Sequence, residues 1–220
     1  MYEVLEMNEK LIRIVNELRT DNANSKFLNC TDNFHALDKD EQKSIELQAE
    51  MAADKLVDCF WEDTNASLRI GDMMDSLNFV VARSSTFSSD EISGILAINQ
   101  DIPKRKIPSK LILVNDNDNI GHQRFTIAHE LAHYIFDVMT DTPYYEAYYR
   151  IDEEKNKEIK EYRANKFAAN LLMPKSIFIP RYEYLTNKLS NKSTVNKFLS
   201  RDFSVSLTAI EKRVQELKLG

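Results

Sequence analysis

The sequence predicts an α+β fold that is rich in helices and holds one small sheet. Glycine and proline are scarce among the 220 residues, at 4 and 5, whereas sandwiches and barrels need many tight turns. Apolar residues recur at helical spacing over most of the chain, and only three short runs near its middle have the composition of strands. A hydrophobic fraction of 43% lets a chain of this length bury a substantial core.

The first part of the chain is expected to be helical. Periodic apolar residues predict an amphipathic helix over residues 2–18 and a longer helix over residues 40–61. The segment 21–38 between them is rich in asparagine, aspartate and serine, which is typical of a loop. A short helix is expected over residues 70–77. We assign residues 1–64 to an N-terminal helical region.

The period of the sequence then changes from helical to β-prone. Phe79–Ala82, Ser93–Ile98 and Lys110–Val114 are short apolar runs separated by polar turns. Three such runs in succession predict a small, mainly antiparallel, three-stranded sheet. A strongly apolar helix is expected next, over residues 122–138.

A second strong helix is expected after a connector. Residues 140–150 contain four tyrosines and are interpreted as that connector, whereas residues 153–172 have helical periodicity. Pro174 and Pro180 are expected to end this helical stretch. We assign residues 65–180 to a core domain.

The C-terminal segment, residues 181–220, has the cadence of a helix-turn-helix. Two short helices, over residues 194–200 and 206–217, are joined by a tight turn. The basic side chains that gather there are Lys197, Arg201, Lys212, Arg213 and Lys218. The whole chain nevertheless has a net charge of −6, whereas nucleic-acid binders present a positive surface. We therefore expect this helical pair to pack on the core or contact a partner protein, and direct DNA binding is the weaker interpretation.

The cellular location is also constrained by the sequence. The N-terminal residues lack the basic start and unbroken apolar run of a signal peptide. No stretch approaches the ~18 apolar residues of a membrane helix. The two cysteines form no CxxC pair and no disulfide framework. We expect a soluble, cytoplasmic protein.

A pair of histidines on the apolar helix predicts a metal site. His129 and His133 are four residues apart, so both project from one helix face and can reach a single zinc ion. Glu130 lies between them and is placed to contact a water at that ion, which suits a general base. Two histidines in so apolar a helix are costly to bury without a partner. The pattern therefore predicts a catalytic zinc site with Glu130 as the base.

A catalytic zinc ion needs a third protein ligand and one open position. Glu161 on the downstream helix is our first choice, and Glu153, Glu154 and Glu158 are the rivals on the same helix. Asn165 follows Glu161 by one helical turn, so it can fix the ring of a ligand histidine through a hydrogen bond. Four tyrosines of the connector are candidates for an oxyanion donor or a cleft wall, although simple packing is the favoured interpretation: Tyr144, Tyr145, Tyr148 and Tyr149.

Two blocks of sequence resemble the ImmA/IrrE family of zinc metallopeptidases. They are residues 124–133, which contain the HEXXH pattern, and residues 161–174, which run Glu-Tyr-Arg-Ala-Asn-Lys-Phe-Ala-Ala-Asn-Leu-Leu-Met-Pro. The resemblance extends over roughly residues 65–180 and implies a zincin-like core there. Two departures stand out, because family members often have glycine at the position of Ala132 and an acidic residue at that of Arg163.

The resemblance also implies the site and the activity. It carries over His129, His133 and Glu161 as zinc ligands and Glu130 as the catalytic residue. Family members cut helix-turn-helix repressors of mobile elements or stress genes, so the expected function is peptide-bond hydrolysis in such a partner, with a consequence for transcription. The alternative is a zinc-containing regulatory protein that binds a repressor or DNA without cleaving it. The intact Glu130 favours the peptidase, since a binding-only site needs no general base.

Overall fold

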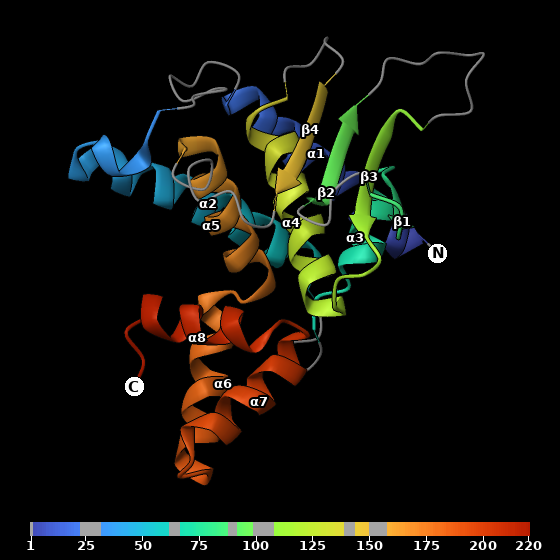
Figure 1. Ribbon diagram of the computed structural model, residues 1–220. Helices are drawn as coiled ribbons and strands as arrows, with labels where there is room; N and C mark the ends of the chain where they lie inside the picture. The colour runs from blue at the N-terminus through green and yellow to red at the C-terminus, as the bar shows by residue number, and fades with distance from the viewer. Residues whose placement is uncertain are drawn as a thin grey trace.

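The computed structural model describes residues 2–22, 32–61, 67–87, 92–98, 108–138, 144–149 and 158–220, without the side chains of residues 2–4 and 144–149. The helices, shown in Figure 1, are α1 (Tyr2–Asn22), α2 (Lys39–Phe60), α3 (Ile70–Ser76), α4 (Ile120–Phe136), α5 (Ile159–Leu172), α6 (Lys175–Lys188), α7 (Lys192–Phe203) and α8 (Leu207–Glu216), with a 3₁₀ turn at Phe34–Ala36. The strands are β1 (Val80–Ser84), β2 (Ile92–Ile98), β3 (Lys110–Asn115) and β4 (Tyr144–Tyr149). The predicted α+β class is confirmed.

The sheet has four strands in the order β1-β3-β2-β4. β2 pairs antiparallel with both β3 and β4, and β1 pairs parallel with β3. The three predicted strands are present, and two of the three pairings are antiparallel. The interpretation of residues 140–150 as a plain connector was wrong, because Tyr144–Tyr149 forms the edge strand next to β2. Its paired tyrosines hide the period-two pattern of a strand, although aromatic residues favour sheets.

The helices α4 and α5 lie side by side in the core. α4 contacts β2 and β3 with one face and α5 with another, while α2 packs on α5 and α1 packs on α2 and α4 (Figure 1). α4 begins after Asn119, whose side chain accepts a hydrogen bond from the His122 backbone N–H at 3.0 Å. It is buried nearly all round, as an apolar helix in the middle of a domain should be. Such a helix can hold polar side chains only if their partners come from its neighbours.

The prediction that two prolines end the helical stretch was partly wrong. Pro174 does separate α5 from α6, as the residue that precedes α6. Pro180 lies inside α6, which the sequence analysis did not predict. A proline removes one helical hydrogen bond, and here the helix continues because Phe178, Tyr182 and Leu185 bury its inner face.

The helix-turn-helix-like pair is present as α7 and α8. Ser204 takes a left-handed conformation in the turn, at φ 53°, and Ser206 caps α8 by accepting from the Ala209 backbone N–H at 3.1 Å. Phe203 and Ile210 belong to the same buried cluster as Leu11 of α1. One apolar core thus contains residues from all three predicted segments, whose boundaries at 64 and 180 stay a prediction. Within the described residues no helix is both long and apolar enough to cross a membrane.

Candidate metal centre

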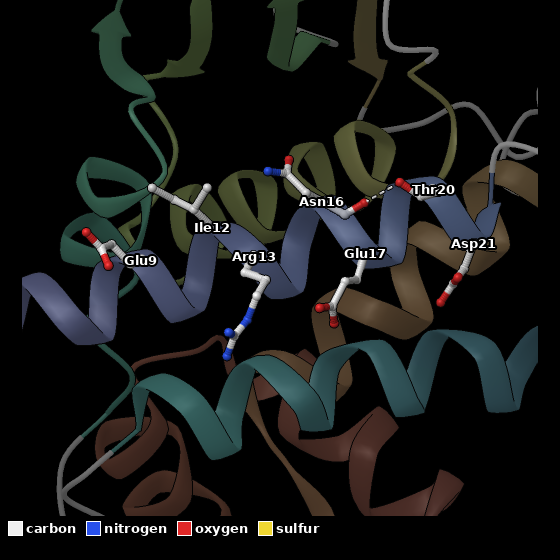
Figure 2. A pocket seen from close by; sticks show the side chains of 7 residues that line it. All are labelled: Glu9, Ile12, Arg13, Asn16, Glu17, Thr20 and Asp21. Carbon is white, nitrogen blue, oxygen red and sulfur yellow. Dashed lines mark hydrogen bonds between the residues drawn. The ribbon is translucent and has the colours of Figure 1, made fainter.

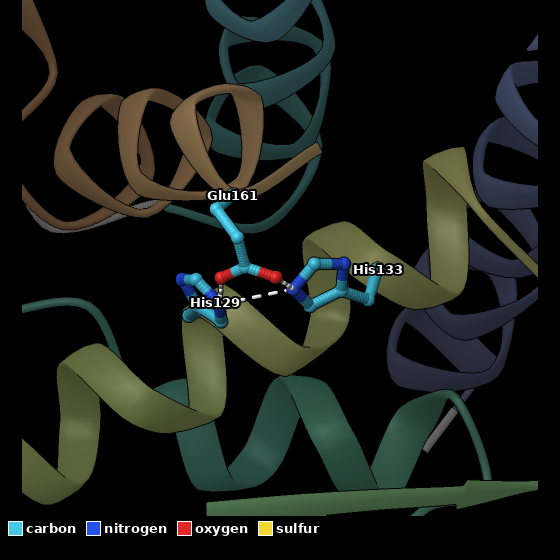
Figure 3. Close-up of side chains that lie close together, drawn as sticks. All are labelled: His129, His133 and Glu161. Atoms are coloured by element: carbon cyan, nitrogen blue, oxygen red, sulfur yellow. Dashed lines mark hydrogen bonds and ion pairs between the residues drawn. The ribbon is translucent and has the colours of Figure 1, made fainter. Parts of the chain in front are cut away.

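Three side chains that the sequence analysis singled out meet between α4 and α5. His129 and His133 project from one face of α4, and Glu161 points at them from the first turn of α5 (Figure 3). His129 Nε2 lies 3.2 Å from Glu161 Oε2, and His133 Nε2 lies 3.4 Å from Glu161 Oε1. The two Nε2 atoms are 2.9 Å apart. All three residues are buried.

The donor set fits a zinc ion. One atom from each of these three residues lies within 4.8 Å of the others, and no further His, Cys, Asp or Glu among the described residues joins a group of this kind. Two atoms bound at ~2.1 Å to a tetrahedral zinc ion are roughly 3.4 Å apart, close to the spacing of these side chains. Two imidazoles and one carboxylate also leave one position of a tetrahedron open, as hydrolytic zinc sites require.

Burial and neighbouring charges act differently on the three side chains. Burial alone would raise the pKa of Glu161, but the charge of His133 and hydrogen bonds with both histidines hold that pKa well below its ordinary value. Burial would also lower the pKa of His133, yet Glu161 and Asp137 raise it well above 6.5. Burial prevails at His129, whose pKa is lowered. Glu161 is therefore held as an anion, the form in which a carboxylate binds a cation.

Each histidine is oriented through its second ring nitrogen. His129 Nδ1 lies 3.0 Å from Asn165 Oδ1, one turn after Glu161 on α5. His133 Nδ1 lies 2.8 Å from Asp137 Oδ2, the residue that ends α4. Both contacts leave Nε2 turned toward Glu161, and such partners fix the tautomer of a ligand histidine. Asn165 was expected from the sequence, whereas Asp137 was missed, although its spacing of four residues from His133 places it on the same helix face.

Glu130 is buried against the sheet. Its side chain is fully inaccessible, and an ideal Cβ built on Gly94 of β2 would lie 3.4 Å from its Oε1. The same Cβ would overlap with Cγ2 of Thr126 on α4. Only glycine lets β2 approach α4 this closely. The sequence analysis did not single out Gly94, because its value depends on a helix that lies far along the chain.

A match to a protein family accompanies this geometry. Residues 86–215 match the model of the IrrE N-terminal-like domain, a metallopeptidase family. The chain belongs to this family. The resemblance drawn from the two sequence blocks is thereby confirmed. The IrrE-like match includes α4, α5 and every side chain named in this centre, whereas α1, α2, α3 and β1 precede it. No curated protein matches the chain.

A cleft of about 670 Å³ adjoins the centre of this IrrE-like domain. It lies between the first half of α4, α5 and α8, and it reaches the centre through Phe125 and Asn165. Its other walls include His122, Lys166, Met173, Ser206, Lys212 and Glu216. A second hollow, of about 680 Å³, is lined by α1 alone and shares no residue with the centre; Figure 2 shows its lining from Glu9 to Asp21. Of these two hollows, the cleft beside α8 is the one that adjoins the metal centre.

Several candidates of the sequence analysis lie elsewhere. Glu153 and Glu154 lie outside the described residues. Glu158 precedes the first residue of α5 and does not belong to the group of three. The four tyrosines Tyr144, Tyr145, Tyr148 and Tyr149 lie in β4, whose side chains are also outside the described part, so their role stays a prediction.

Proposed function

We propose that the protein is a zinc-dependent endopeptidase of the HEXXH type. The observation that carries the proposal is the buried meeting of His129, His133 and Glu161 on two packed helices, with Glu130 adjacent in sequence. Membership in a metallopeptidase family supports the reaction class. An acidic side chain beside the ligands suits hydrolysis, whereas a purely structural zinc site uses four protein ligands.

The residues of the chain divide the chemistry among them. A bound zinc ion would supply a Lewis acid that polarises the scissile carbonyl and makes water a better nucleophile near neutral pH. Glu130 takes the proton of the attacking water and then delivers it to the leaving amine. Asn165 and Asp137 hold the rings of His129 and His133, and the buried surroundings exclude other water.

The proposed substrate is a helix-turn-helix repressor of a mobile element or a stress response. The cleft beside α8 supports a polypeptide substrate, because it extends from Asn165, which bonds the ligand His129, to Thr208 and Lys212 of α8. The proposed place of action is the cytoplasm, where such a repressor meets DNA. We do not propose DNA binding by α8 itself, since Arg213 is turned inward, 2.8 Å from the Met173 carbonyl and 2.7 Å from Asn170 Oδ1.

Cleavage by matched variants tests the proposal. The purified protein is incubated with zinc and each helix-turn-helix protein encoded beside it, and fragments are identified by mass spectrometry. We expect a specific cut by the wild type and, with Glu130→Gln, a loss of at least ~100-fold, the contribution of a positioned general base. Zinc content should stay unchanged in this variant. A wild type that binds such a repressor without cutting it would favour the non-cleaving regulatory alternative.

A further inference from the structure

A line of hydrogen bonds connects His133 to helices that precede the family match. Asp137 bonds His133 through Oδ2 and accepts from Arg163 Nη2 through Oδ1, at 2.5 Å. Arg163 Nη1 in turn donates to Gln48 Oε1 of α2, at 3.4 Å. The Gln48 amide N–H donates to Asn22 Oδ1 at the end of α1. We call Gln48, Arg163 and Asp137 the relay.

The burial of Arg163 and Asp137 makes the geometry of their contact specific. The side chains of Arg163 and Asp137 are 0% and 1% exposed, so bulk water does not compete for their hydrogen bonds. The Arg163 guanidinium also lies over the ring of Phe136, 4.7 Å from its centroid, which restricts it further. With one carboxylate oxygen on Arg163, the other is directed at His133. Arg163 therefore sets the rotamer of Asp137, which holds the ring of His133.

Gln48 has an orientation that its two hydrogen-bond partners determine. Its carbonyl oxygen faces the Arg163 guanidinium and its amide nitrogen faces Asn22. Asn22 is itself fixed, because its side-chain nitrogen donates to the Leu18 carbonyl at 2.6 Å. A flipped amide would set donor against donor at Arg163 and acceptor against acceptor at Asn22. The side chain of Gln48, in the middle of α2, thus connects the end of α1 to Arg163.

The two ligand histidines differ in what holds them. His129 is held by Asn165, which stands on the same helix as Glu161. His133 is held by Asp137, Asp137 is held by Arg163 of α5, and Arg163 in turn contacts Gln48 of α2. We propose that Gln48 and Arg163 are positioning residues for His133, so that the N-terminal helices contribute to the metal affinity of the site. This inference rests on the proposed zinc site but not on the identity of the substrate.

Part of the relay lies outside the family match. Gln48 and Asn22 precede that match, which begins at residue 86, whereas Arg163 and Asp137 lie within it. The helices before the match are thus joined to the metal centre by a direct contact between Gln48 and Arg163.

Substitution of Gln48 tests the relay without opening the core. Gln48→Leu keeps the size of a half-buried side chain and removes its amide. Gln42→Leu is the matched control, because Gln42 stands on the same helix, is also half-buried, and bonds only the Phe34 and Leu37 carbonyls at 3.2 Å among the contacts described. The readouts are the zinc dissociation constant, from competition with a chelator, and the visible spectrum of the cobalt(II)-loaded protein.

We expect Gln48→Leu to weaken zinc binding about tenfold, which is the lower end of what the hydrogen-bond partners of a metal ligand contribute. The cobalt spectrum should shift as well. Arg163→Met should weaken binding by about 10–100-fold. Gln48→Leu should add nothing in the Arg163→Met background, because both act through one contact. Gln42→Leu should match the wild type. Arg213→Met, which removes a buried arginine outside the relay, should lower stability and leave the zinc dissociation constant unchanged.

Three results would overturn the relay. They are an unchanged dissociation constant and spectrum in Gln48→Leu, equal effects of Gln42→Leu and Gln48→Leu, and additive effects of Gln48→Leu and Arg163→Met. If Arg163→Met does not fold, Gln48→Leu decides alone. A wild type without zinc affinity contradicts the proposed function itself. If the wild type binds zinc and cleaves its substrate, and Gln48→Leu has the same zinc affinity, only the relay is contradicted.

Discussion

Gly94 sets how closely the sheet approaches Glu130. It is one of four glycines, and it faces the side of α4 that carries Thr126 and Glu130. A side chain at this position would displace the Thr126 side chain and crowd the Leu113 carbonyl and Glu130 Oε1. The position of the proposed general base therefore depends on a residue that carries no chemistry of its own.

Gly94→Ala is expected to destabilise the protein and impair catalysis together. An added Cβ overlaps with Thr126 Cγ2, and overpacking of this kind costs about 1–3 kcal/mol of the free energy of unfolding. Thermal and denaturant unfolding measure the stability, and cleavage measures the displacement of Glu130. Gly71→Ala is the control, since nothing lies within 4 Å of the added Cβ. Alanine is also more favourable than glycine in a helix by up to about 1 kcal/mol. Equal stability of the two variants would contradict this account.

Side chains that act through distant partners were the least predictable part of the site. His129, Glu130 and His133 follow from a local pattern. Glu161 was the first choice among four glutamates of a second helix, and Asn165 follows from its spacing of one turn from Glu161. Asp137 was within reach of the same reasoning and was overlooked. Gly94 and Gln48 were not within reach, because the role of each depends on an element far along the chain. A single sequence does not show that the two segments are in contact.

At the scale of elements, α8 is attached to α5 by charged side chains at the edge of the cleft. Glu216 of α8 bonds both Lys166 of α5 and Arg213 of its own helix. Burial raises the pKa of Glu216, but the Lys166 hydrogen bond and the charge of Arg213 outweigh it and hold the pKa below the ordinary 4.5. The ionised form of Glu216 therefore stabilises the fold.

The pH dependence of stability tests this attachment. Because the folded-state pKa of Glu216 is depressed, its contribution is present above about pH 4.5 and is lost as the pH falls through that lower pKa. The free energy of unfolding of Glu216→Gln should lie below that of the wild type at neutral pH, and the two should converge in acid. Glu211→Gln, which removes an exposed carboxylate from the same helix, is the control. A difference that does not change with pH would contradict the attachment.

The elements themselves were predictable where one periodicity dominates. α2, α4, α5 and α8 have long apolar faces, and their helical spacing identified them. α6 was missed because Pro180 outweighed its apolar face in the interpretation, and β4 was missed because adjacent tyrosines obscure alternation. In both segments packing decides the structure: α6 buries Phe178, Tyr182 and Leu185, and β4 pairs along β2. Sequence patterns identify such segments poorly, since tertiary contacts override local preference.

At the scale of the molecule, the N-terminal helices and the IrrE-like domain share one core. Leu11, Val15 and Leu18 of α1 are buried in the same cluster as Ile210 of α8. Arg19 adds a polar contact, donating to the hydroxyl of Tyr134 on α4 at 3.0 Å. The family match therefore covers less of the chain than its core does.

A single cooperative transition is expected when the protein unfolds. Leu11→Ala removes a side chain that is 0% exposed, which costs about 2–5 kcal/mol. Since its neighbours belong to the common core, the variant should lower the midpoint of the one transition in calorimetry. Two transitions, of which Leu11→Ala shifts only one, would instead support an independent N-terminal domain and contradict the shared core.

The central claim is that His129, His133 and Glu161 hold one zinc ion beside Glu130, and the zinc content of purified variants tests it most directly. Wild type and Glu130→Gln should each retain about one zinc per chain after dialysis, the stoichiometry of one three-ligand site. Glu161→Ala should retain almost none while keeping its helical content. A wild type without zinc, or a Glu161→Ala protein that keeps its zinc, would contradict the claim.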